Sequence, residues 1–408
     1  MILTTKQEEG LKIAVQRYND GAPYTVISGY AGTGKSTLIK FIISALNVHP
    51  DDVCYIAYTG KAATVLQQKG CPNATTAHQL LYHAKPMPNG TFKFVPKAHL
   101  EYKVIVVDEI SMLPKPMWEQ LLSHGIYIIA AGDPGQLPPV DKDMDNGVLN
   151  NPHIFLDEIM RQAQDSEIIR LSMWVREGKS LSTFPCAKEQ VQLFSPHEVV
   201  DGMYSWADQI LCATNATRNN INNFVRTQKG FGPEPCVGDK VISLHNHWQY
   251  LSDNEVWALT NGSIGTLKYF YKEDFYAPRY IKEEPITFMF SNIELDDGSM
   301  FNMAPIDYQA LTTGIPALDG KQSYLLKKNK YAKIDPPFDF AYAYAITTHK
   351  AQGSEWDKVL ILEESFPYNQ EEHIRWLYTA ITRAKEKVVI IKKPLFIFIK
   401  KYDIIYKE

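Results

Sequence analysis

The most constraining feature of this 408-residue chain is a glycine-rich segment near its N-terminus. Residues 25–37 read Thr-Val-Ile-Ser-Gly-Tyr-Ala-Gly-Thr-Gly-Lys-Ser-Thr. A β-branched run predicts a buried strand before the glycines, and apolar residues at helical spacing follow them as far as Leu46. The spacing G-x-x-x-x-G-K-S between a strand and a helix predicts a phosphate-binding loop, rather than a glycine-rich turn that happens to precede a lysine.

The residues of this loop have predicted roles in holding ATP and Mg²⁺. Glycines let consecutive backbone N–H groups turn inward as an anion nest, and the helix N-terminus adds positive charge at the same place. Lys35 would contact the β- and γ-phosphates, and the Ser36 hydroxyl would bind Mg²⁺. The predicted nucleotide-binding set in this loop is Gly29, Ala31, Gly32, Thr33, Gly34, Lys35, Ser36 and Thr37.

Two later apolar segments end in residues suited to hydrolysis. The run 104–107 is apolar throughout, as in parallel strands covered on both faces, and it ends in Asp108 and Glu109. After a phosphate-binding loop, Asp108 is expected to hold the metal and Glu109 to polarise the attacking water; the alternative is a capping pair before a helix. The run 126–131 leads into a loop rich in Gly and Pro, in which Gln136 is a candidate to reach the γ-phosphate.

Other polar residues in the first half leave two interpretations open. Gln7, in a first predicted helix, either contacts an adenine edge or is a solvated surface glutamine, and the residue alone favours the surface. Thr59, Lys61 and His78 lie near the carboxyl ends of predicted strands, where ligands bind in open sheets. They therefore contact phosphates, or, as the alternative, Thr59 and Thr75 only cap helices.

Residues 83–100 form a predicted hairpin insertion in the first half. Asn89-Gly90 is a strong signal for a two-residue turn, and Phe92 and Phe94 fall on one face because side chains alternate along a strand. These two aromatic side chains either act as a wedge against a base pair or pack the hairpin onto the body of the protein.

Composition narrows the class of protein. Apolar content of 45% and charged content of 22% are ordinary globular values, and the length allows two or more domains. The net charge of −4 requires any nucleic-acid site to be a local groove. Five scattered cysteines without a C-x-x-C pair argue against a zinc site or a disulfide framework. With no apolar run of about 18 residues and no signal-like N-terminus, we expect a cytoplasmic protein without a membrane segment.

The order of these motifs resembles that of the superfamily 1 helicases. Residues 29–37, 58–69, 106–112 and 132–140 are similar, in turn, to motifs I, Ia, II and III of that family. The forms Asp-Glu-Ile-Ser-Met and Gly-Asp-Pro-Gly-Gln-Leu-Pro-Pro-Val look closest to the RecD-like branch, which includes the phage Dda helicases. This resemblance implies two RecA-like domains with ATP between them, and movement from 5′ to 3′ on single-stranded DNA.

The resemblance continues through the second half. Arg161 matches a family arginine that reaches the ATP phosphates, and residues 345–355 and 376–384 look like motifs V and VI. Arg383 in motif VI would stabilise charge on the leaving γ-phosphate, and Glu355 is expected close to the nucleotide. The implied contacts to DNA phosphates are Thr214, Asn215, Thr348, His349 and Lys350, with a helix N-cap as the alternative reading of Asn215.

The predicted fold is α/β, with two RecA-like parallel-sheet domains. The first spans residues 1–82 and 101–157, with the hairpin of residues 83–100 inserted between them. The second spans 158–235 and 338–408 and carries a β-rich insertion at 236–337, where the family has an SH3-like barrel.

The predicted function is an ATP-dependent DNA helicase that moves 5′ to 3′ and unwinds duplex DNA. The expected partners are single-stranded DNA and forked duplex DNA, together with replication, recombination or repair proteins that no motif identifies. One alternative is a translocase that displaces or remodels bound proteins without substantial unwinding. Another is a binding module that uses ATP as a switch, against which the complete set of acids and arginines argues. No residue pattern identifies a reader of the RNA 2′-OH, so RNA stays open as a substrate.

Overall fold

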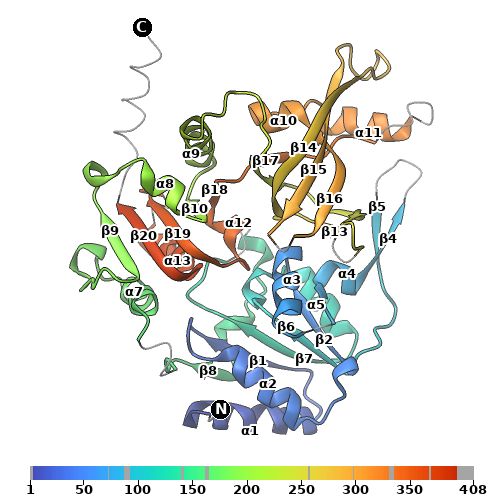
Figure 1. Cartoon of the computed structure of the whole chain (residues 1–408). Helices are drawn as coiled ribbons and strands as arrows, with labels where there is room; N and C mark the ends of the chain where they lie inside the picture. Colours follow the sequence, from blue (N-terminus) through green and yellow to red (C-terminus); the bar gives the residue numbers. More distant parts are fainter. Residues whose placement is uncertain are drawn as a thin grey trace.

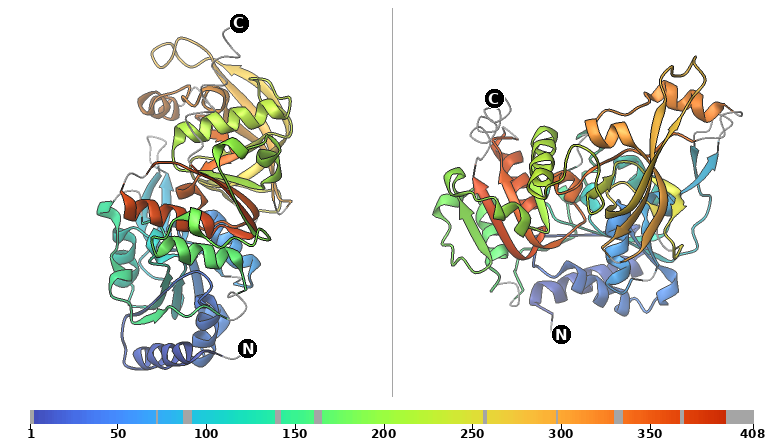
Figure 2. Two further views of the ribbon diagram at one scale, coloured as in Figure 1. Left: turned by 90° about the vertical axis from the view of Figure 1, so that its left-hand side faces the viewer. Right: turned by 45° about the horizontal axis from the view of Figure 1, so that its top comes forward.

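The computed structural model describes residues 3–71, 73–86, 92–138, 142–160, 165–255, 258–296, 298–329, 335–366 and 369–392, without the side chains of 84–86, 92, 93, 142 and 248. Two parallel sheets form neighbouring domains, and an antiparallel sheet stands above the first of them (Figure 1). The turned views show the same arrangement, with the antiparallel sheet at the opposite end of the molecule from the N-terminus (Figure 2).

The first sheet has six parallel strands in the order β3-β2-β6-β7-β1-β8. Helices α1 and α2 cover one face, and α4 and α5 cover the other. Val104 and Val106 face the first pair of helices, whereas Ile105 and Val107 face the second, which explains why this strand is apolar throughout. The elements are β1 (Tyr24–Gly29), β2 (Val53–Ala57), β3 (Ala74–Thr76), β6 (Val104–Val107), β7 (Tyr127–Gly132), β8 (Ile154–Leu156), α1 (Thr5–Asn19), α2 (Lys35–Ala45), α3 (Gly60–Gln68), α4 (Ala77–Leu81) and α5 (Lys115–Ser123).

The second sheet has five parallel strands in the order β18-β10-β19-β20-β9. Helices α7 and α13 pack on one face, and α8 and α9 on the other. Leu137 of the first domain belongs to the same buried cluster as α7 and α13, so the two domains share part of a core. The elements are β9 (Val191–Phe194), β10 (Gln209–Cys212), β18 (Ala345–Thr347), β19 (Trp356–Glu363), β20 (Ala384–Lys392), α7 (Glu167–Arg176), α8 (Gly202–Trp206), α9 (Asn215–Gln228), α12 (Thr348–Ala351) and α13 (Gln370–Ile381).

The antiparallel sheet is inserted into the second domain, between α9 and β18. Its strand order is β16-β15-β14-β11-β17. The chain enters the insertion through β11 and leaves it through the edge strand β17, and these two strands pair with each other. A buried ion pair of 2.9 Å between Arg226 on α9 and Asp239 fixes its base. Within the insertion, β12 and β13 pair with each other as a separate two-stranded sheet. The elements of the insertion are β11 (Lys240–Ser243), β12 (His247–Leu251), β13 (Ala258–Leu259), β14 (Ile264–Phe275), β15 (Ile286–Leu295), β16 (Met300–Asp307), β17 (Phe340–Tyr342), α10 (Tyr308–Thr313) and α11 (Gly320–Lys328).

The predicted hairpin insertion is present as the antiparallel pair β4 (Tyr82–Pro86) and β5 (Phe92–Pro96), at the edge of the first domain (Figure 1). The turn residues between these strands lie outside the described part of the chain. Short 3-10 helices occupy Pro50–Asp52, Ile110–Met112, Lys142–Met144, Val148–Asn150, Leu181–Thr183 and Pro196–Glu198.

The predicted fold class is confirmed by the two parallel sheets and the inserted antiparallel sheet. The exact domain limits stay a prediction; β17, at residues 340–342, pairs with the inserted sheet although it follows the limit of 337 expected for the insertion. In the described part of the chain, no helix is both long and apolar enough to cross a membrane.

Candidate nucleotide and nucleic-acid site

The phosphate-binding loop joins β1 to α2. Gly32 and Gly34 both have φ of 77°, a left-handed conformation that residues with a Cβ rarely adopt. Gly34 is also the N-cap of α2, so the loop ends at a helix N-terminus. Lys35 Nζ donates to the carbonyl oxygens of Gly29 at 2.7 Å and Tyr30 at 3.1 Å, which holds the ammonium group against the loop.

Two acids stand beside this loop at the carboxyl end of β6. Burial raises the pKa of Asp108, and the charge of Lys35 opposes this effect. Burial also raises the pKa of Glu109, opposed chiefly by Arg383. Glu109 has φ of 55°, a left-handed conformation that is uncommon for a residue with a Cβ. The backbone therefore leaves the extended conformation of β6 at Glu109.

Mg²⁺ fits the oxygen donors at this point. The Ser36 hydroxyl is exposed at the start of α2, and a hydroxyl with the Asp108 carboxylate is a hard oxygen set of the kind that Mg²⁺ prefers. Within the described ranges no group of three or more His, Cys, Asp or Glu side chains could hold a metal ion. Binding of the ion by Ser36 and Asp108, together with phosphates and water as is usual in phosphoryl-transfer sites, stays a prediction.

The second domain reaches the acids through Arg383. Gln136 is buried between Glu109 and Arg383. In the amide orientation that satisfies both neighbours, Gln136 donates to Glu109 Oε2 at 2.8 Å and accepts from Arg383 Nη2 at 3.3 Å. Arg383 Nη1 lies 4.0 Å from Glu109 Oε1. The structure thus brings together three predicted catalytic residues from both domains, whereas Arg161 lies outside the described residues.

Gln7 packs against the phosphate-binding loop and forms a hydrogen bond with its backbone. Its side chain is only 1% exposed, and Nε2 donates to the carbonyl oxygen of Thr33 at 3.2 Å. A Cβ on Gly34 would lie 2.5 Å from the same nitrogen, which shows how closely α1 approaches the loop. The surface interpretation favoured for Gln7 is therefore wrong, because tertiary packing buries it; contact with an adenine edge stays a prediction.

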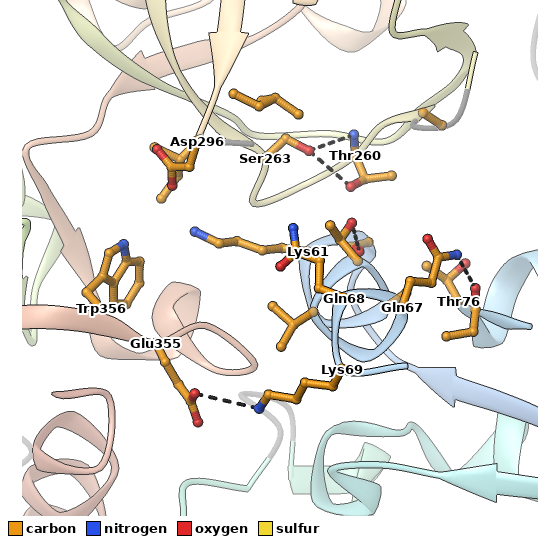
Figure 3. A pocket seen from close by; sticks show the side chains of 18 of the residues that line it. Lys61, Gln67, Gln68, Lys69, Thr76, Thr260, Ser263, Asp296, Glu355 and Trp356 are labelled. Carbon is orange, nitrogen blue, oxygen red and sulfur yellow. Dashed lines mark hydrogen bonds and ion pairs between the residues drawn. The ribbon is translucent and has the colours of Figure 1, made fainter. Parts of the chain in front are cut away.

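Lys61 and Glu355 line a cavity of about 950 Å³ between α3, the inserted sheet and the start of β19 (Figure 3). Lys61 Nζ lies 4.7 Å from the centroid of the Trp356 ring, and burial lowers the pKa of Lys61. Glu355 forms an ion pair with Lys69 at 3.7 Å. The structure thus places both residues on the walls of a polar space where three parts of the molecule meet.

An aromatic row leads from the end of β2 to the hairpin. The His78 ring lies 5.9 Å from Tyr58, 6.2 Å from Tyr82 and 6.1 Å from Phe94, measured between centroids. Phe94 remains 45% exposed, so it packs against the body with one part of its surface and stays exposed with the rest. The side chain of Phe92 lies outside the described part of the structure.

Thr59 and Thr214 cap helices. The Thr59 hydroxyl accepts from the Ala62 N–H at 3.2 Å, at the start of α3. The Thr214 hydroxyl accepts from the Thr217 N–H at 3.2 Å, at the start of α9. The expectation of an N-cap at Asn215 is wrong by one residue, since Thr214 holds the extended backbone of the cap and Asn215 is the exposed first residue of the helix. Phosphate contacts by these residues stay predictions.

Residues 348–350 begin α12 and differ in exposure. Thr348 is fully buried and its hydroxyl donates to the carbonyl oxygen of Cys212 at 3.4 Å, so this side chain has no exposed surface to offer a phosphate. Lys350 Nζ donates at 2.5 Å to Oδ1 of Asn261, in the turn of the insertion between β13 and β14. Burial lowers the pKa of both His349 and Lys350.

Two contacts between the domains were missed by the sequence analysis. The Arg176 guanidinium lies 3.5 Å from the centroid of the Tyr30 ring, and the Tyr378 hydroxyl reaches Asp133 and the phosphate-binding loop. Both tyrosines lie in segments that the motifs single out. Their partners come from the other domain, however, and spacing along the chain cannot reveal contacts across a domain boundary.

Family models match both halves of this site. An AAA domain model matches residues 3–198, and a UvrD-like helicase C-terminal domain model matches residues 342–391. The first match covers the phosphate-binding loop, both acids and Gln136. The second covers Arg383 and the segment that precedes β19.

Named relatives agree with these models. The ATP-dependent RecD2 DNA helicase of Deinococcus radiodurans is 26% identical over 405 residues, which cover 90% of this chain and 46% of that protein. The ATP-dependent DNA helicase dda of Enterobacteria phage T4 is 32% identical over 148 residues, 34% of this chain and 33% of that protein. The chain thus spans less than half the length of these curated relatives.

Solved structures show the same fold. A crystal structure of a Pif1 helicase from Bacteroides, in complex with ADP-AlF3 and ssDNA, has a TM-score of 0.55 and 17% identity, and the match covers 100% of this chain and 98% of that one. From the motif order, the family models and these relatives, the chain belongs to the superfamily 1 helicases, in the branch that contains the RecD-like, Pif1 and Dda proteins.

Proposed function

We propose that this protein hydrolyses ATP between its two parallel-sheet domains to move 5′ to 3′ along single-stranded DNA and to unwind duplex DNA. The observation that carries the proposal is the position of Gln136, buried between Glu109 of the first domain and Arg383 of the second. A hydrolytic base and a charge-stabilising arginine that meet only when the domains are together make turnover depend on domain closure.

The chemistry follows from the residues around the phosphate-binding loop. Lys35 and the backbone N–H groups would bind the phosphates, and Ser36 with Asp108 would hold Mg²⁺. Glu109 would accept a proton from the attacking water, and Arg383 would stabilise charge on the γ-phosphate as its bond to the β-phosphate breaks. Loss of that phosphate removes the group that both domains grip, so the cleft is biased toward opening.

The nucleic-acid part of the proposal rests on the relatives and on the aromatic row. Solved Pif1 structures of the same fold hold single-stranded DNA, and one describes unwinding at forked duplex DNA. In this chain Tyr58, His78, Tyr82 and Phe94 form a row of rings, and bases stack on aromatic rings regardless of sequence. The direction of movement is that of the RecD-like branch.

The test is ATP-driven unwinding of one duplex that carries in turn a 5′ tail, a 3′ tail or no tail. Opening only with the 5′ tail supports the proposal, and opening only with the 3′ tail refutes the direction. Strand-stimulated hydrolysis without opening would instead favour a translocase that displaces bound proteins. Lys35→Ala is the control, since it should abolish hydrolysis and opening while single-stranded DNA still binds.

A further inference from the structure

Tyr378 connects three segments of the catalytic cleft through one hydroxyl group. It lies on α13 of the second domain and its side chain is 1% exposed. The hydroxyl donates to Asp133 Oδ2 at 2.6 Å and accepts from the Ala31 N–H at 2.9 Å. Ala31 belongs to the phosphate-binding loop, and Asp133 begins the loop that carries Gln136.

The Asp133 carboxylate links this contact to the backbone of its own loop. Its second oxygen, Oδ1, accepts from the Gly135 N–H at 2.8 Å. A Cβ on Gly135 would lie 3.0 Å from Tyr378 Cε1, so the loop lies directly against the tyrosine ring. Burial raises the pKa of Tyr378 well above its ordinary value, so the hydroxyl keeps the proton that it donates to Asp133.

The residue after Gln136 is held from the second domain as well. The Leu137 N–H donates to Thr379 Oγ1 at 2.9 Å, and the Leu137 carbonyl accepts from Gln352 Nε2 at 2.8 Å. Gln136 thus lies between two backbone positions that are both anchored through the second domain. Tyr378 differs from Thr379 in that its contact also reaches the phosphate-binding loop.

We propose that Tyr378 is a positioning residue, whose hydroxyl sets the conformation of the Ala31 N–H and of the Gln136 loop together. Opening of the cleft would release both at once, because one hydroxyl holds both. The inference rests on the proposed function for its link to ATP turnover, but the contact itself is a property of the chain. Tyr378 would act through Asp133 and Gln136 rather than on the reacting atoms.

The test compares Tyr378→Phe with Tyr127→Phe in the full chain. Tyr127 is also a buried tyrosine whose hydroxyl makes two hydrogen bonds, to Ala14 O at 3.0 Å and Thr25 Oγ1 at 2.6 Å, but it lies inside the first domain. Both variants lose a buried hydroxyl, so both should lose similar stability. Only Tyr378→Phe should speed amide hydrogen exchange in residues 29–34 and 132–138, by about tenfold.

The kinetic signature of positioning is a change in kcat without a matching change in KM. We expect Tyr378→Phe to lower kcat for ATP about tenfold, with KM within about threefold of wild type. Asp133→Asn should do the same, and the double variant should be no slower than the slower single variant, since both act through one network.

Exchange rates and kcat that match those of Tyr127→Phe would overturn the inference. The exchange measurement needs neither DNA nor unwinding. A wild-type protein that fails to open a tailed duplex would therefore contradict the proposed function, whereas unchanged exchange in Tyr378→Phe would contradict only the role of Tyr378.

Discussion

At the scale of single residues, Glu109 is the acid through which the first domain meets Arg383 of the second. The residue has a left-handed backbone, accepts from Gln136 and faces Arg383 of the other domain. Its carboxylate therefore lies where both domains meet, as the proposed role of a general base in a closed cleft requires. Lys35, by contrast, contacts only carbonyl oxygens of its own loop in the hydrogen bonds that its ammonium group makes.

Glu109→Gln should separate binding from hydrolysis. The amide keeps the size of the side chain but cannot accept a proton, so kcat should fall by about 100-fold or more while nucleotide affinity changes little. Single-turnover hydrolysis together with equilibrium binding of a fluorescent ATP analogue measures both. Glu101→Gln, at an exposed glutamate before β6, is the matched control and should retain full turnover. Equal loss of affinity and turnover would remove Glu109 from the role of base.

The positions of the candidate catalytic residues were predictable from the sequence because each follows from local chain chemistry. A strand that ends at a glycine loop or at two acids determines the position of Lys35, Asp108 and Glu109 within one sheet edge. Gln7 was misjudged because its burial depends on how α1 packs against the loop. The partners of Tyr378 were out of reach for the same reason, since they belong to another domain.

At the scale of elements, the hairpin is the clearest case of a local signal that leaves its environment open. Asn89-Gly90 predicts the pairing of β4 with β5, which the structure shows. Turn chemistry does not determine what the hairpin packs against. The ring contacts of Phe94 with His78 and Tyr82 depend on where α4 and β4 lie, so only the structure shows both its packed and its exposed sides.

Phe94→Ala should slow duplex unwinding several-fold, while translocation on single strands stays within about twofold of wild type. The ring is exposed at the hairpin, where it can stack on a base pair at a fork but is not needed to grip phosphates. Stopped-flow unwinding and displacement of an end-bound fluorophore measure the two rates. Tyr276→Ala, at a 76% exposed tyrosine just after β14, serves as the control. Equal slowing of both processes would assign Phe94 to packing alone.

His247, on β12, should make the β-rich insertion sensitive to acid. Its ring stacks on Phe338 at 3.7 Å, and burial lowers its pKa from an ordinary 6.5 to about 4. Between pH 6.5 and 4, His247 is protonated in the unfolded chain but stays neutral in the folded chain. The free energy of unfolding therefore decreases as the pH falls from 6.5 toward 4. The loss of stability over this range should be about 3 kcal/mol, seen as a lower urea midpoint.

The variant His247→Phe should remove this part of the pH dependence, because it keeps the stacked ring and cannot be protonated. His197→Phe, at an exposed histidine of the second domain, should leave the dependence as it is in wild type. A pH profile that is the same for His247→Phe and wild type would contradict the assignment.

At the scale of the whole molecule, the insertion contacts the first domain where the side chain of Thr260 packs against the backbone of Gly60. A Cβ built on Gly60, at the start of α3, would lie 2.0 Å from Thr260 Oγ1. The insertion belongs to the second domain by chain connection, so this contact is part of the interface that any domain movement must alter. No sequence pattern predicts this contact, because a glycine such as Gly60 at the first position of a helix does not indicate what packs against it.

Gly60→Ala should push the insertion away from α3 and cost about 1–3 kcal/mol, the usual price of overpacking. Adding Thr260→Gly should restore most of the loss, because it removes the atoms that the new methyl group meets. Thermal unfolding of the two variants and wild type measures this. Gly320→Ala is the control, since a Cβ there meets no atom within 4 Å. A Gly60→Ala protein as stable as Gly320→Ala would show that the contact gives way freely.

The long hairpin β14–β15 would amplify a rotation of the insertion. Its base pairs with β11, next to the second domain, and β14 alone runs for 12 residues, about 40 Å at ~3.3 Å per residue. A rotation of roughly 10° about that fulcrum would sweep the far end through about 7 Å. The displacement of the far end then depends on the bending stiffness of these two strands. A more flexible hairpin would transmit less of any rotation that begins at the nucleotide cleft.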